Sequence, residues 1–185
     1  MENYVKEILF GYPLLRTVEE DYQMHIRNKA VLSHNCAMSA EKLAEYLAGE
    51  ILTMRSLQSL KRTIEEVLDK LSLEERTLIE IRYFGRRKKM RGFLKRRISK
   101  GNPRECSETT YFRRQRALGE KVAAMLHFAG ITKEKYLAEY ASSDIFKKIH
   151  TFVEAGKDKM IAADERRLLG RRGKETEAET SCGQA

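Results

Sequence analysis

The apolar residues between positions 39 and 71 follow a spacing that strongly restricts the fold of this chain. They recur at intervals of three and four residues, which places them on one face of an α-helix and argues against a β-strand. Ser39 lies just before them and is a suitable N-cap. The pattern predicts an amphipathic helix of about 30 residues, with Gly49 as a point at which it can bend. Its apolar face is formed by Leu43, Leu47, Ile51, Met54, Leu57, Leu60, Ile64, Val67, Leu68 and Leu71.

The rest of the chain also favours helix. Pro occurs only at positions 13 and 103, so very little of the 185-residue chain is excluded from helical structure. The strong helix formers Leu, Glu, Lys, Arg and Ala dominate the composition. The alternation of β-branched residues that is typical of strands hardly appears. We therefore predict an all-α fold.

Turn signals divide the N-terminal part into two predicted helices. A short apolar helix over 4–12 is expected to end at Gly11-Tyr12-Pro13, because proline interrupts the hydrogen bonding of a helix. A second helix is expected over 14–33. The weak apolar face of this second helix indicates a packing helix rather than a long coiled coil.

The middle of the chain carries a strong helix start signal. Ser72 and Glu75 have the spacing of a capping box, which predicts a helix over 73–84 that stops at Gly85. The next segment is basic but still has apolar residues at helical spacing, and it predicts a short amphipathic helix over 87–98. A dense turn signal follows it.

The last helices are also predicted from their caps. Ser107 is expected to cap a helix over 107–128 that ends before Gly130. Two shorter helices are expected to begin at Thr132 and Ser143, and a weaker one over 158–169. The predicted organisation is therefore N-terminal helices (1–38), a long amphipathic helix (39–71), a helix-turn-helix module (72–130), C-terminal helices (131–169) and a disordered tail (170–185).

Positive charge is concentrated in one segment, residues 82–116. This segment holds 14 Lys and Arg against only Glu105 and Glu108, a local charge of +12, whereas the chain as a whole is +9. The remaining residues together carry −3. A block of one sign is suited to neutralising phosphates, because bound cations displace the counterions condensed on nucleic acid. A solubilising patch or a membrane-surface patch is the alternative interpretation.

Three consecutive predicted helices, 73–84, 87–98 and 107–128, have the layout of a helix-turn-helix. The third would present Thr and Arg from its first two turns to a major groove, where Arg pairs with guanine and Thr meets thymine methyl or phosphate. On this helix Tyr111 lies on the apolar face, with Arg113 and Arg116 opposite. The predicted DNA-binding residues are Arg86, Arg87, Lys88, Lys89, Arg96, Arg97, Ser107, Thr109, Thr110, Arg113, Arg114 and Arg116.

Two sequence stretches in this module carry a family resemblance. LSLEERTLIEIRYFG (71–85) followed by CSETTYFRRQRALGEKVAAML (106–126) resembles the region 4-like helix-turn-helix of sigma-70-type factors. The stretches are most similar to small phage and prophage regulators of the ArpU type, and the resemblance extends over roughly residues 60–126. It implies DNA binding and control of transcription, with the helix from 107 as recognition helix. The matching motif positions are Arg82, Tyr83, Phe84, Ser107, Thr109, Thr110, Tyr111, Phe112, Arg113 and Arg114.

The chain departs from this family in the second helix and the turn that follows it. The family usually has a scaffold helix with small residues and a tight turn, whereas residues 86–106 are longer and far more basic, so the geometry between the second and third helices stays open. The N-terminal part also lacks the aromatic residues of a promoter-melting domain, so a complete sigma factor is not expected.

Partners and location follow from these features. We expect double-stranded DNA as ligand and a homodimer held by residues 40–71, because a single half-site gives little specificity. Packing of this apolar face on other helices of the same chain is the alternative, and it stays open. RNA polymerase is a further candidate partner. Cys36, Cys106 and Cys182 form no disulfide framework, which suits a reducing cytoplasm. With DNA as the expected ligand, we expect the protein in the bacterial cytoplasm, associated with the nucleoid. No membrane span is predicted.

Catalytic and metal sites are not predicted. The four His residues have no partners at metal-ligand spacing, and no phosphate-binding loop, dinucleotide fingerprint or nucleophile elbow occurs. We therefore expect neither enzyme activity nor a cofactor. Two other functions stay open, namely an RNA- or single-strand-binding accessory protein that uses the arginine-rich segment 86–97, and a helical phage assembly or packaging factor.

Overall fold

The computed structural model describes residues 2–31, 39–85, 108–157 and 159–165. These residues form helices and contain no strand, which confirms the predicted all-α fold. The predicted helix over 87–98, the cap Ser107 and the tail 170–185 lie outside the described residues. The helices are α1 (Asn3–Val31), α2 (Ala40–Asp69), α3 (Leu73–Tyr83), α5 (Glu108–Phe128), α6 (Lys133–Glu139) and α7 (Asp144–Glu154).

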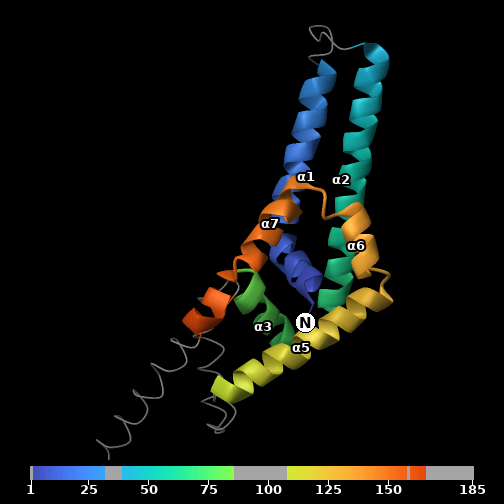
Figure 1. Cartoon of the computed structure of the whole chain (residues 1–185). Helices are drawn as coiled ribbons and strands as arrows, with labels where there is room; N and C mark the ends of the chain where they lie inside the picture. The colour runs from blue at the N-terminus through green and yellow to red at the C-terminus, as the bar shows by residue number, and fades with distance from the viewer. Residues whose placement is uncertain (1, 32–38, 86–107, 158, 166–185) are drawn as a thin grey trace, which may run out of the picture.

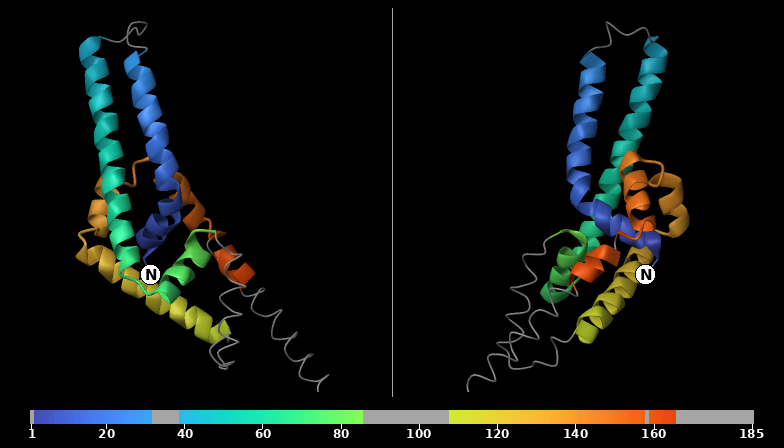
Figure 2. Two further views of the ribbon diagram at one scale, coloured as in Figure 1. Left: turned by 180° about the vertical axis from the view of Figure 1, so that it is seen from behind. Right: turned by 60° about the vertical axis from the view of Figure 1, so that its left-hand side comes forward.

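The two long helices form an antiparallel hairpin that organises the molecule (Figure 1). Helix α5 crosses the base of this hairpin, and the short helix α3 lies beside it. Helix α6 follows α5, and α7 packs along the N-terminal part of α1. The far end of the hairpin projects beyond the other helices (Figure 2).

Helix α1 differs from the prediction of two helices separated at Pro13. It is one helix of 29 residues that contains Pro13 in its interior. Proline in a helix interior costs about 3 kcal/mol and usually bends the helix, and the N-terminal part of α1 runs at a clear angle to the rest (Figure 2). Buried residues on both sides of the proline, including Leu9 and Leu15, pack into the same core. We attribute the continuity of the helix to this packing.

The predicted caps Ser39, Ser72 and Thr132 are confirmed, whereas Ser143 precedes α7 without a capping hydrogen bond from its side chain. The Ser39 side chain accepts a hydrogen bond from the backbone N–H of Lys42. Ser72 and Glu75 form the reciprocal capping box at the start of α3. Gly85, with φ of 66°, follows the end of this helix in a conformation that favours glycine.

A single hydrophobic core joins the described helices. It includes residues from α1, α2, α3 and α5 and, from the C-terminal part, Tyr136, Phe146 and Val153. Leu57 and Ile64 of α2 are only 3% and 1% exposed in the single chain. They therefore belong to this core, and the part of the α2 face near them is not free to hold a second subunit.

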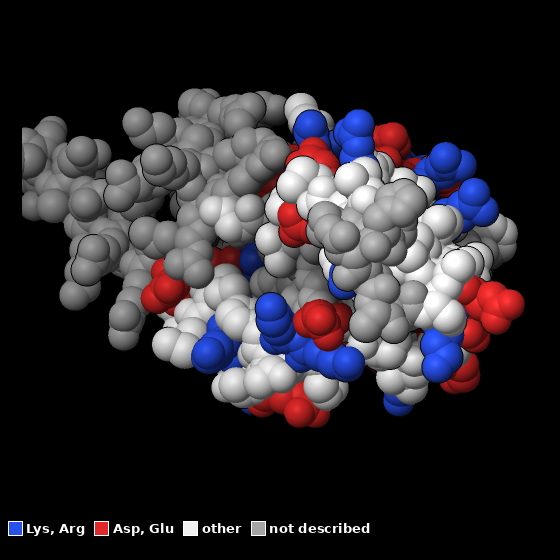
Figure 3. Space-filling model, turned by 90° about the horizontal axis from the view of Figure 1, so that it is seen from above, with Lys and Arg blue, Asp and Glu red and all other residues white. Residues whose placement is uncertain are grey.

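The projecting part of the hairpin is less well covered. Leu47, Ile51 and Met54 are half-buried there, and Met24 and Leu52 are each 65% exposed. Seen from above the hairpin, basic and acidic side chains of the described residues lie next to each other (Figure 3). This end of the molecule therefore lacks the one-sign charge of segment 82–116.

None of the described helices is both long enough and apolar enough to cross a membrane.

Candidate nucleic-acid interface

Helix α5 has one face that attaches it to the core. Tyr111 and Leu118 are each 4% exposed on this face. Between them, the Gln115 amide donates to the backbone carbonyl of Leu78 in α3 at 3.0 Å and to the Tyr111 hydroxyl at 3.2 Å. The N-terminal half of α5 is therefore fixed against α3 by apolar packing and by a polar contact to the backbone.

The opposite face of α5 presents two arginines to solvent. Arg113 and Arg116 are exposed, and neither forms an ion pair with a residue that the structure describes. Because Tyr111 and Gln115 hold the other face against α3, these guanidinium groups project from a fixed backbone. Their arrangement agrees with the predicted polar face of the helix.

A second pair of cations on α5 faces acidic residues of α3. Arg114 Nη1 lies 3.5 Å from Glu74 Oε1, and Lys121 Nζ lies 2.8 Å from Glu75 Oε1. The hydrogen bond from Lys121, together with that from the Ser72 backbone N–H, lowers the pKa of Glu75 below its ordinary value. These contacts connect the two helices, and they partly compensate the charge of Arg114.

Arg82 is also compensated, by a carboxylate from the C-terminal part of the chain. Its guanidinium pairs with Glu165, whose side chain is 1% exposed. Burial raises the pKa of the nearby Tyr111 hydroxyl, and the charge of Glu165 raises it further. Arg82 therefore braces α3 against the segment 159–165, and its charge contributes little to an external ligand.

The other predicted DNA-binding residues are placed only in part. Thr110 is half-buried on α5, and Thr109 belongs to the first turn of this helix. Seven predicted contact residues lie outside the described residues: Arg86, Arg87, Lys88, Lys89, Arg96, Arg97 and Ser107. The structure therefore brings together Arg113, Arg114 and Arg116 on one half of α5 and leaves the predicted turn undescribed.

Aromatic residues near the interface pack inward. Phe10 of α1 contacts Tyr83 with ring centroids 4.9 Å apart, and Tyr12 contacts Phe84 at 5.0 Å. Phe112 packs against the core and against Tyr111. These rings are occupied in the fold and form no open stacking platform.

Sequence reasoning missed the contacts that fix α5 in place. Gln115 lies one helical turn after Tyr111 and so falls on the apolar face, where a polar residue needs a partner. The place of Gln115 on the apolar face was therefore the one sequence signal for this partly buried polar contact. No local pattern pointed to Glu165 as the partner of Arg82, because 83 residues separate them.

The described residues contain no group of three or more His, Cys, Asp or Glu side chains that could hold a metal ion. His25 Nε2 lies 3.0 Å from the Tyr46 hydroxyl, and His150 Nδ1 lies 2.9 Å from a Glu7 oxygen. Both histidines thus take part in contacts within the fold.

Comparisons of the chain with protein-family models, with curated proteins and with solved structures found no match.

Proposed function

We propose that this protein is a sequence-specific regulator of transcription that binds double-stranded DNA, with the N-terminal half of α5 as its recognition helix. The two-sided character of this helix carries the proposal. One face is fixed against α3 through Tyr111 and Gln115, and the other presents Arg113 and Arg116 free of described ion-pair partners. A rigid helix with exposed arginines is the element that reads base edges in a major groove.

The sequence next to this helix supports the same ligand. Segment 82–116 carries a local charge of +12, which is enough to contact several phosphates. Arg82 and Arg114 have carboxylate partners, so Arg113 and Arg116 are the described cations of the segment that are available to nucleic acid. RNA polymerase remains a candidate partner of a DNA-bound regulator.

Duplex DNA is favoured over single-stranded ligands because of the aromatic residues. Proteins that bind single strands use exposed rings on which bases stack. Here Tyr83, Phe84 and Phe112 pack against the core instead. The second candidate function is RNA binding through the arginine-rich segment 86–97. The titration described next distinguishes RNA binding from duplex DNA binding.

The test is a titration of the intact chain with duplex DNA, single-stranded DNA and structured RNA at one fixed salt concentration. The duplex pool should contain a site selected from random sequences. We expect the selected duplex to bind best, and Arg113→Ala or Arg116→Ala to cost about 1–3 kcal/mol at that site. Arg27→Ala, which removes an exposed arginine from α1, is the control and should bind normally.

Other outcomes would redirect the proposal. Equal losses on selected and random duplexes would mean that the two arginines contact only phosphates. Preferential binding of RNA or of single strands by the intact chain would overturn the duplex proposal. Unchanged binding in both variants would remove α5 as the recognition helix.

A further inference from the structure

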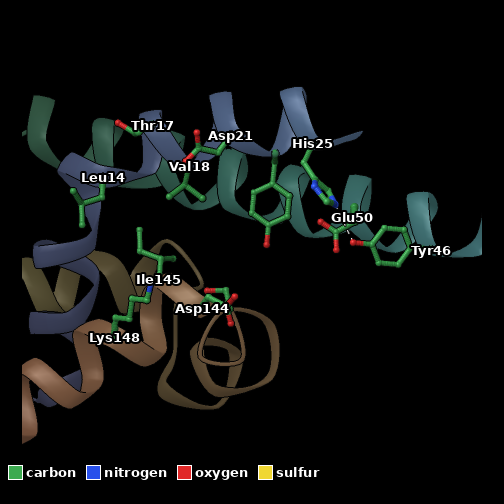
Figure 4. A pocket seen from close by; sticks show the side chains of 12 residues that line it. Leu14, Thr17, Val18, Asp21, His25, Tyr46, Glu50, Asp144, Ile145 and Lys148 are labelled. Atoms are coloured by element: carbon green, nitrogen blue, oxygen red, sulfur yellow. Dashed lines mark hydrogen bonds between the residues drawn. The ribbon is translucent and has the colours of Figure 1, made fainter. Parts of the chain in front are cut away.

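A groove lies where the projecting hairpin meets the start of α7 (Figure 4). It has a volume of about 620 Å³. Its apolar side is formed by Leu14, Val18 and Tyr22 of α1 and Ile145 of α7. Leu14 is 48% exposed, and Tyr46 of α2, at the far end of the groove, is 40% exposed. The groove is thus an open surface with apolar side chains accessible to a partner.

The same groove carries negative charge. Asp21, Glu50 and Asp144 line it from three different helices, and Lys148 is the only Lys or Arg among its described lining residues. Lys147 Nζ lies 3.8 Å from Asp144 and partly compensates its charge, so Asp21 and Glu50 contribute most of the negative charge. The hydroxyl of Tyr22 lies among these groups, and its pKa is raised first by burial and then by the charges of Glu50 and Asp144. In a chain with net charge +9, this groove is a local site of the opposite sign.

We infer that this groove binds a basic amphipathic helix of a partner protein. The α1 stretch from Leu14 to His25 is about 16 Å long at 1.5 Å per residue, which matches about three turns of a helix. An amphipathic helix could place its apolar side chains against Leu14 and Val18 and its Lys or Arg residues near the carboxylates. This is the helix-in-groove mode of recognition with complementary charge.

The charge also distinguishes among occupants. Nucleic acid would be repelled, because the lining carboxylates face its phosphates. A second copy joined by a two-fold axis through this groove would place Asp21 and Glu50 opposite their own equivalents, which is unfavourable. A basic partner helix avoids both the repulsion of phosphates and the repulsion between equivalent carboxylates of two copies. The inference does not depend on DNA binding, which we assign to α5.

The experiment uses the intact chain and a synthetic peptide of about four helical turns, made of Leu and Lys with the Leu residues at helical spacing. A matched peptide with Glu in place of Lys is the control ligand. We expect the Lys peptide to bind at least about tenfold more tightly than the Glu peptide at low salt, with the difference reduced at high salt.

Variants of the chain then locate the binding site. Asp21→Asn combined with Glu50→Gln should weaken binding of the Lys peptide about tenfold. Leu14→Asn, at an exposed position, should weaken it through the apolar contact. Glu41→Gln combined with Glu120→Gln removes the same charge from exposed positions outside the groove and should leave binding unchanged. Thermal unfolding of each variant confirms that it is folded.

Three results would overturn the inference. Equal binding of the Lys and Glu peptides would remove the role of charge. Equal weakening by the groove pair and by the control pair would show a diffuse electrostatic effect. A chain that sediments as a dimer and dissociates on the Asp21 and Glu50 substitutions would show that a second copy occupies the groove.

Discussion

At the scale of single residues, the fold depends on how the buried carboxylate of Glu7 is satisfied. Glu7 is 3% exposed, and the Tyr136 hydroxyl donates to it at 2.7 Å. His150 Nδ1 lies 2.9 Å from its other oxygen. These contacts join α1 to α6 and α7, over sequence separations of 129 and 143 residues.

Removing the Tyr136 hydroxyl should therefore destabilise the fold. We expect Tyr136→Phe to lower the free energy of unfolding by about 1–3 kcal/mol, because the Glu7 carboxylate loses a donor in a buried place. Tyr4→Phe is the control, since the Tyr4 hydroxyl forms no hydrogen bond with a described residue. Urea denaturation measures both. Equal effects of the two variants would show that the Tyr136 hydroxyl is not needed for stability.

The His150 contact predicts a pH dependence of stability. The hydrogen bond to Glu7, with the charges of Glu7 and Glu154, raises the pKa of His150 above its ordinary value of 6.5. A raised folded-state pKa gives stability that is fully present below pH 6.5 and is lost as the pH rises through the folded-state value. We expect His150→Gln to be most destabilising near pH 6 and least so above the folded-state pKa.

Urea midpoints across this pH range test the prediction. His127→Gln, which removes an exposed histidine from the end of α5, is the control. A destabilisation by His150→Gln that is the same at every pH would mean that the ionic form of the imidazole contributes nothing. The effect is expected to be small, because the side chain of His150 is 52% exposed.

At the scale of helices, local signals predicted boundaries well. Ser39 and Thr132 act as caps as predicted, because a cap depends only on residues within the next turn. Ser143 precedes α7 as predicted, but its hydroxyl donates to the Tyr140 carbonyl instead of capping the helix. Pro13 was misjudged, because the packing that keeps α1 continuous comes from residues far away in the sequence.

Two glycines in long helices provide a matched test of packing against propensity. A Cβ at Gly11 would lie 2.8 Å from Phe146 Cε1, whereas a Cβ at Gly49 would have no neighbour within 4 Å. We expect Gly49→Ala to stabilise the chain by about 0.5–1 kcal/mol through helix propensity. Gly11→Ala should instead destabilise it by about 1–3 kcal/mol, because α1 and α7 would be forced apart.

Thermal or urea unfolding of the two variants measures these opposite signs. Stabilisation by both substitutions would contradict the close packing of α1 on α7. Glycine at position 11 thus depends on a neighbour about 135 residues away, and no local pattern in the sequence distinguishes it from Gly49.

At the scale of the whole molecule, the sequence predicted the class of fold but not how the segments share a core. The apolar face of α2 was correctly placed on a helix, yet the sequence left open whether a second subunit or the same chain covers it. The structure covers its lower half within one chain, as the burial of Leu57 and Ile64 shows. Charge substitutions at these two positions are therefore expected to unfold the chain rather than to separate subunits.

The candidate interface was predictable only for α5, because helical periodicity places Arg113 and Arg116 opposite the apolar face.

The uneven cover of the α1–α2 hairpin leads to a prediction about its dynamics. Backbone amides near Leu60 and Ile64 lie in the core and should exchange hydrogen only on global unfolding. Amides in the projecting part, near Met24 and Leu52, should exchange through local opening at a much lower free energy, since few side chains cover them. Hydrogen exchange measured by mass spectrometry, with sedimentation at the same concentration, tests this. A monomer with uniform protection along α2 would contradict the prediction. Strong protection confined to a sedimenting dimer would instead show that a second copy covers the projecting hairpin and would support the homodimer expected from residues 40–71.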